Sequence, residues 1–300
     1  MGQKQIFTGT IGRTVKDTEY RYEAIPEKRR ADAPNVVYIV LDDLGFAQLG
    51  CYGSSIQTPN IDRLAAGGLR YNNFHTTAIC SATRASLLTG ANHHSVGCCA
   101  TIEMITGCPN GAGELDKSYG TLAEILKEYD YDTFACGKWH LTSWGALNQA
   151  GPFDSWPLGR GFDRYYGFLH AMMNQYNPIL VRDNSFVDQP KTPEEGYHFS
   201  EDITDHAIDY ICTQKNAYPD RPFFLYLAYG AMHAPHHAPQ KYIDMYKGKF
   251  DEGWDELRLK WFANQKRLGI IPEDAELNPR NEYVPEWNSL SMEQKKVCAR

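Results

Sequence analysis

Segments with strand and helix patterns alternate along this chain of 300 residues, and the alternation constrains its fold more than any other feature. The β-branched apolar run at 36–41 is typical of a strand that is buried on both faces. Further strands are predicted at 69–76, 131–136 and 223–229, and helices at 59–66, 82–89, 118–129, 200–215 and over most of 240–271. This order predicts the α/β class, with a doubly wound, mostly parallel sheet and helices on both faces.

Two of the predicted helices carry a clear apolar face. The helix at 118–129 is amphipathic, and the helix at 200–215 begins with Ser200 as its expected cap. The positions expected to face the core are Leu122, Ile125 and Leu126 in the first helix, and Ile203, Ala207, Ile208 and Ile211 in the second.

The chain is predicted to divide into an N-terminal arm at 1–34 and a folded domain at 35–300. The arm is polar and is expected to lie on the surface. The segment 142–199 is rich in Trp, Tyr, Pro and Gly, and we interpret it as a long insertion that forms a lid or a binding wall. A last helix, capped by Ser289 or Ser291, stops without a C-terminal signal, which predicts that the chain is a fragment of a longer protein.

Charge and hydropathy exclude several classes of partner. The formal net charge of -7 argues against a general nucleic-acid binder, which usually carries a basic surplus. No apolar run approaches the roughly 18 residues that a membrane span needs. No secretory leader is visible, so we expect a cytoplasmic protein with reduced thiols, or a periplasmic or secreted one if a leader was removed.

Polar, reactive residues follow directly after the predicted strands, where a doubly wound sheet holds its ligand. Asp42 and Asp43 come after the first strand. Two adjacent carboxylates repel each other, and a hard cation such as Ca²⁺ or Mg²⁺ relieves that repulsion. The alternative is a helix cap followed by an exposed acid, and the pair alone does not decide between the two.

Two further segments hold a nucleophile and cations. Cys80 begins a predicted helix turn with Arg84 nearby, which favours a reactive thiol, although a free cysteine is also often a small buried hydrophobe. Lys138 and His140 follow a strand on the same side of an extended backbone and would make an anion clamp. Their alternative is a surface lysine and a packed histidine.

Three histidines lie within five residues in the stretch HAPHHAP. Such a cluster suggests a metal such as zinc, but the prolines break regular spacing and no partner motif accompanies it. We therefore expect His233 to point inward, with His236 and His237 at the periphery.

Four stretches together resemble the type I sulfatases, within the alkaline-phosphatase-like superfamily. NVVYIVLDDLG is similar to the family's opening strand and acid pair, CSATRASLLTG lies in its best-known signature, and GKWHL and HAPHHAP are similar to two others. The resemblance runs from about Asn35 to the C-terminus and is strongest to the bacterial arylsulfatases. It implies the N-terminal domain of a sulfatase, without the end of that domain and its smaller C-terminal subdomain.

The resemblance implies a mechanism. A formylglycine-generating maturation enzyme would oxidise Cys80 to formylglycine, whose hydrate would coordinate Ca²⁺ beside Asp42 and Asp43 and attack the sulfur of a small (aryl) sulfate ester. Arg84 would hold the formylglycine. The resemblance also implies that Lys138 and His233 bind the sulfate and that His140 helps to expel it.

Two departures from the family pattern matter. Ala82 replaces the usual proline of the signature, which points to maturation by the anaerobic radical type of enzyme. The family's Asp-Asn metal pair and a further lysine have no match after His233, so weak Ca²⁺ binding is expected. The alternative functions are a phosphate or phosphonate ester hydrolase of the same superfamily, and a truncated, non-catalytic module that binds anions.

Overall fold

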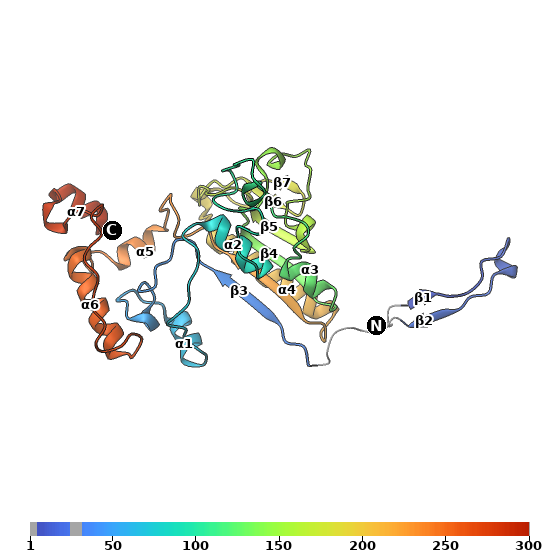
Figure 1. Ribbon diagram of the computed structural model, residues 1–300, viewed down its shortest axis with the longest axis horizontal. Helices are drawn as coiled ribbons and strands as arrows, with labels where there is room; N and C mark the ends of the chain where they lie inside the picture. The colour runs from blue at the N-terminus through green and yellow to red at the C-terminus, as the bar shows by residue number, and fades with distance from the viewer. Residues whose placement is uncertain (1–4, 25–31, 300) are drawn as a thin grey trace.

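A six-stranded sheet forms the centre of the computed structural model, which describes residues 5–24 and 32–299 (Figure 1). In sheet order its strands are β3 (Val36–Val40), β8 (Phe223–Ala228), β4 (Asp132–Lys138), β5 (Arg164–Phe168), β6 (Leu180–Arg182) and β7 (Ser185–Val187). The first four strands run parallel, and β6 and β7 are antiparallel to their neighbours. The predicted α/β class with a mostly parallel sheet is therefore confirmed.

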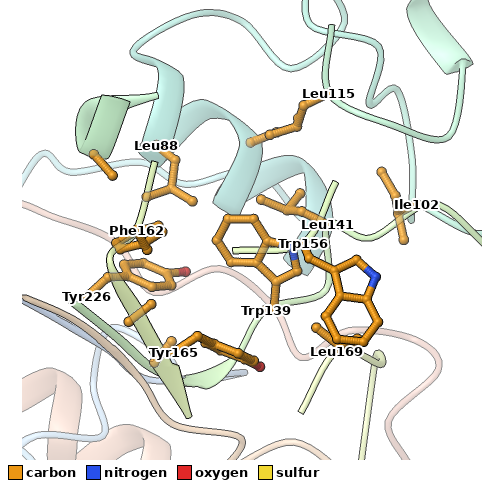
Figure 2. Close-up of a cluster of buried hydrophobic side chains, with 14 of the residues drawn as sticks. Leu88, Ile102, Leu115, Trp139, Leu141, Trp156, Phe162, Tyr165, Leu169 and Tyr226 are labelled. Carbon is orange, nitrogen blue, oxygen red and sulfur yellow. The ribbon is translucent and has the colours of Figure 1, made fainter. Parts of the chain in front are cut away.

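Apolar side chains of the central strands alternate between two cores, one on each face of the sheet. On β8, Phe224 and Tyr226 belong to the core beneath α2 (Cys80–Thr89) and α3 (Leu122–Lys127). Phe223 and Leu225 belong to the other core, which α4 (Phe199–Ala217) covers. Figure 2 shows the first core, where Trp139 and Phe162 meet edge to face. Helices thus cover both faces, as the sequence predicted.

The strands approach each other closely at Gly137, next to the end of β4. A Cβ atom at Gly137 would lie 1.9 Å from the carbonyl oxygen of Ala228, and one at Gly167 would lie 2.0 Å from the carbonyl oxygen of Gly137. The φ of Gly137 is +104°, which L-residues rarely adopt. Glycine at this position lets β4 carry Lys138 to the sheet edge between two close neighbours.

Two of the strand and loop predictions are wrong. Residues 69–76 form no strand, and Leu69 (83% exposed) and Phe74 (68% exposed) have no sheet to pack against. The segment 142–199 is not an insertion outside the sheet, because it supplies β5, β6 and β7. Its Trp, Tyr and Gly content resembled a loop, yet Tyr165 and Tyr166 are almost fully buried in β5.

Two predicted helices are present with corrected boundaries and faces. α3 is shorter than 118–129 because Thr121 caps it, in a reciprocal pair with Glu124. α4 begins one residue before Ser200, and His198 is its cap. Ile125 (48% exposed) and Ile208 (54% exposed) do not face the core. The other predicted core positions of these helices are buried or partly buried: Leu122, Leu126, Ile203, Ala207 and Ile211.

The remaining helices lie where they were predicted, except that α2 begins at Cys80 rather than at residue 82. α1 (Pro59–Ala66) begins after Thr58, and α5 (Gln240–Met245) and α6 (Gly253–Arg267) fill most of the last predicted helical region. α7 (Met292–Cys298) begins at Ser291, which caps it together with Gln294.

The described part of the N-terminal arm forms a hairpin of β1 (Gln5–Phe7) and β2 (Tyr22–Ala24) (Figure 1). Residues 25–31 of the arm lie outside the described residues, so the division at 34 stays a prediction. No helix in the described parts of the chain combines the length and apolar character needed to cross a bilayer.

Candidate active site

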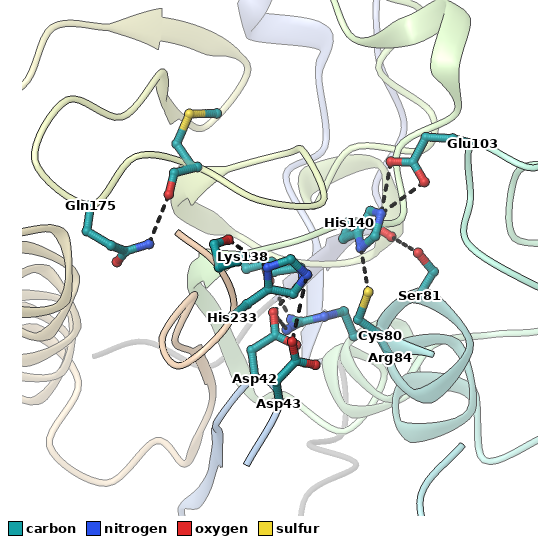
Figure 3. A network of polar contacts seen from close by, with 12 residues as sticks. Asp42, Asp43, Cys80, Ser81, Arg84, Glu103, Lys138, His140, Gln175 and His233 are labelled. Atoms are coloured by element: carbon teal, nitrogen blue, oxygen red, sulfur yellow. Dashed lines mark hydrogen bonds and ion pairs between the residues drawn. The ribbon is translucent and has the colours of Figure 1, made fainter. Parts of the chain in front are cut away.

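The predicted site residues meet at the carboxyl ends of three neighbouring strands (Figure 3). Asp42 and Asp43 follow β3, Lys138 ends β4, and His233 follows β8. The backbone ties two of these segments together, since Asp42 N–H donates to Ala231 (3.1 Å) and its carbonyl accepts from Met232 (2.7 Å). Segments far apart in the chain therefore form one site, where an α/β sheet is expected to hold its ligand.

Asp42 is a buried carboxylate held between two buried cations. Its Oδ2 lies 2.5 Å from Nζ of Lys138 and 3.5 Å from Nη2 of Arg84. The three side chains are 5%, 1% and 2% exposed. A buried charge without a partner would destabilise the fold. In this triad the carboxylate of Asp42 provides the opposite charge for both cations.

Arg84 connects the start of α2 to the sheet. Its Nη1 donates to the carbonyl oxygen of Lys138 (2.7 Å) and to the Tyr226 hydroxyl (3.1 Å). Its Nε is buried and has no hydrogen-bond partner among the described residues. Because Arg84 stands one helical turn after Cys80, that unused donor fits an oxygen placed on residue 80.

Cys80 faces an imidazole that a carboxylate supports from the other side. Its Sγ lies 3.1 Å from Nδ1 of His140, whose Nε2 lies 2.9 Å from Oε1 of Glu103. Burial, followed by the positive charge of Lys138, lowers the pKa of His140 to about 4, although Glu103 opposes this. The imidazole is therefore neutral near neutral pH, so one ring nitrogen carries a proton and the other accepts one.

The adjacent acids and the histidine cluster divide between the site and its rim. The Asp43 side chain is 60% exposed, with Oδ2 3.8 Å from Nε2 of His233. His233 therefore lies beside Asp43, the exposed member of the acid pair, and its predicted role at the site stays a prediction. His237 accepts a hydrogen bond from the backbone N–H of Gln175 (3.4 Å).

Three residues near the site were not singled out from the sequence. Ser81 Oγ donates to the His140 carbonyl (3.0 Å) and accepts from Ile102 N–H (3.2 Å). Glu103 lies in the segment 91–117, which has no regular pattern that could place it. His170 comes two residues after the end of β5, and His140 comes two residues after the end of β4. Because Lys138 and Phe168 are paired in register, the two histidines come at equivalent positions after neighbouring strands. The position of His170 follows from the pairing of β5 with β4. The sequence analysis did not predict β5, so it could not place this histidine.

The described residues fit a formylglycine at position 80 but do not complete a cation site. Cys80 has His140 beside it and the unused Nε of Arg84 nearby. In contrast, no group of three or more His, Cys, Asp or Glu side chains in the described residues could hold a metal. Asp42 and Asp43 supply carboxylate oxygens, whereas Ca²⁺ takes 6–8 oxygens.

Comparison with known proteins gives the family. A family model described as Sulfatase matches residues 34–289. The chain belongs to the sulfatase family. This sulfatase chain is 33% identical to an uncharacterized sulfatase of Schizosaccharomyces pombe, over 92% of the chain and 52% of the relative. It is 29% identical to an arylsulfatase of Klebsiella aerogenes, over 90% of the chain and 58% of the relative.

A solved structure shares the fold of this chain. The crystal structure of Ps i-CgsB in complex with k-i-k-neocarrahexaose is 28% identical, with a TM-score of 0.56 over 79% of this sulfatase chain and 53% of that one. The chain spans about half the length of the curated relatives named above.

Proposed function

We propose that the whole protein is a sulfuric ester hydrolase of the arylsulfatase type, which cleaves a sulfate ester to an alcohol or phenol and sulfate. One observation carries the proposal: Cys80 and His140 stand 3.1 Å apart beside a buried triad of Asp42, Lys138 and Arg84. Membership of the sulfatase family and similarity to a Klebsiella aerogenes arylsulfatase support it.

The proposed roles follow from charge and position. Arg84 and Lys138 place two buried positive charges against one buried carboxylate, which favours an anionic sulfate group. His233 adds an imidazole beside Asp43. Nδ1 of His140 accepts a proton from the group on residue 80 or returns it.

Two cofactors belong to the proposal. A formylglycine made from Cys80, held by Arg84 and His140, supplies an activated oxygen nucleophile when present. We assign its formation to a maturation enzyme of the anaerobic radical type because Ala82 stands in the signature. For the whole protein we also propose Ca²⁺ or Mg²⁺ at Asp42 and Asp43, and we assign it no step because the described residues do not complete its site.

The test is the hydrolysis of an aryl sulfate by the full-length protein, produced together with a maturation enzyme. Intact mass measured on the peptide around residue 80 reports whether Cys80 has been converted. We expect release of sulfate from the converted protein, none from Cys80→Ala, and unchanged activity in Cys212→Ala, whose cysteine is exposed on α4. A converted protein that releases phosphate from an aryl phosphate but no sulfate would replace this proposal with the phosphate ester alternative.

A further inference from the structure

The carboxylate of Glu103 lies against the imidazole ring of His140. Both of its carboxylate oxygens lie within hydrogen-bond distance of His140 Nε2, at 2.9 and 3.1 Å. His140 is fully buried, whereas the Glu103 side chain is 25% exposed. A carboxylate only accepts hydrogen bonds, so this contact places the imidazole proton on Nε2.

The other nitrogen of the same ring faces Cys80. Its Nδ1 lies 3.1 Å from Sγ, and a proton held at Nε2 leaves the Nδ1 lone pair free to accept. The three side chains thus form a line in which carboxylate, imidazole and residue 80 follow one another (Figure 3). In such an arrangement the carboxylate selects the tautomer and orientation of the ring.

Hydrogen bonds to Ser81 fix the backbone next to Glu103. Ser81 bridges Ile102, the residue before Glu103, to the carbonyl of His140. Ser81 is fully buried and Ile102 is 2% exposed, so the bridge belongs to the core. The residue after Cys80 therefore fixes the loop that brings Glu103 to His140.

We propose that Glu103 is a positioning residue, which fixes the tautomer of His140 so that Nδ1 faces residue 80 as a proton acceptor. The proposal rests on the proposed function for its effect on catalysis, but its structural part does not depend on any activity. Glu103 contacts one nitrogen of the imidazole and Cys80 contacts the other, so Glu103 acts on residue 80 through the ring.

The direct test is the tautomer of His140 in the folded chain, read from the ring ¹⁵N shifts and couplings in an NMR spectrum at neutral pH. His140→Gln identifies its signals among the ten histidines. We expect the proton on Nε2 in the unaltered protein and in Glu103→Gln, whose amide oxygen still accepts, and a loss of that preference in Glu103→Ala. A proton on Nδ1 in the unaltered protein, or an unchanged tautomer in Glu103→Ala, would overturn the proposal.

Kinetics on the converted full-length protein give a second, separate readout. We expect Glu103→Ala to lower kcat by at least about 10-fold with KM changed by less than about twofold, and Glu103→Gln to recover most of kcat. Glu114→Gln, at an exposed glutamate of the same loop, is the matched control and should change neither constant. If no variant hydrolyses sulfate esters, the proposed function fails while the NMR result still decides the role of Glu103. If kcat is equal in Glu103→Ala and the unaltered enzyme, the positioning role is wrong.

Discussion

Replacing Asp42 by Asn tests how strongly the buried triad depends on its one carboxylate. Asn keeps the size and an oxygen acceptor, but it leaves Lys138 and Arg84 as two buried cations without a counter-charge. Breaking a buried ion pair costs roughly 3–5 kcal/mol, because the remaining charge stays desolvated. With two cations left beside each other, we expect a loss of about 4 kcal/mol in the free energy of unfolding.

Thermal unfolding followed by circular dichroism measures this loss. A chain of 300 residues has an unfolding entropy of about 0.6 kcal/mol/K, so about 4 kcal/mol corresponds to a fall in Tm of about 6 °C. The matched control is Asp154→Asn. Asp154 also lies 2.5 Å from a lysine, Lys117, but the two side chains are 60% and 65% exposed. Such surface pairs contribute about 1 kcal/mol or less, or less than about 2 °C in Tm.

A double variant separates charge from packing. Adding Lys138→Met to Asp42→Asn removes one of the two uncompensated cations, so we expect part of the lost stability to return. Equal Tm values for Asp42→Asn and Asp154→Asn would refute the reasoning, because burial would then make no difference to the pair. A further fall in Tm in the double variant would show that the lysine stem, rather than its charge, stabilises the site.

Substitutions at Gly137 and Thr121 test two local contacts that stabilise the fold around the site. Gly137→Ala is expected to prevent folding, because its Cβ would lie 1.9 Å from the Ala228 oxygen, whereas Gly90→Ala (φ +68°, open space) should cost only about 1–2 kcal/mol. Soluble yield and Tm measure both, and similar Tm values would contradict this. Thr121→Ala should cost about 2 kcal/mol, because the hydroxyl caps α3 and donates to the Arg160 carbonyl (2.8 Å). Thr121→Ser keeps both bonds, so equal Tm values for the two Thr121 variants would rule out this role of the hydroxyl.

The sequence predicted those parts of the site that immediately follow a regular apolar strand. Asp42 and Lys138 stand where β3 and β4 end, and parallel strands bring their carboxyl ends to the same edge of the sheet. His140 and Cys80 were identified for the same reason, together with a helix start at α2. Local pattern was sufficient because each of these residues lies within a few positions of a recognisable element boundary.

The parts that were missed depend on pairing between distant segments. β5 consists of the stretch RYYGF, where burial on both faces removes the alternation that marks a strand. Its register with β4 places His170, and no local pattern reveals a register. Glu103 contacts His140 directly, and the hydrogen bond between Ser81 in α2 and Ile102 in the irregular segment holds it there across 21 residues of sequence. Tertiary hydrogen bonds of this kind leave no periodic trace in the sequence.

The formal net charge of the whole chain is negative, whereas its buried triad of Asp42, Lys138 and Arg84 carries one net positive charge. The chain carries a formal net charge of -7, yet Arg84 and Lys138 outnumber Asp42 among the buried charges of the triad. Exposed acids are screened by water and salt, whereas buried charges act at short range through a less polar medium. For the anionic ester that we propose as substrate, the two buried cations supply attraction, which the exposed carboxylate of Asp43 partly offsets. Asp42 holds Lys138 Nζ at the edge of the sheet, so the cation is already in place before the anion arrives.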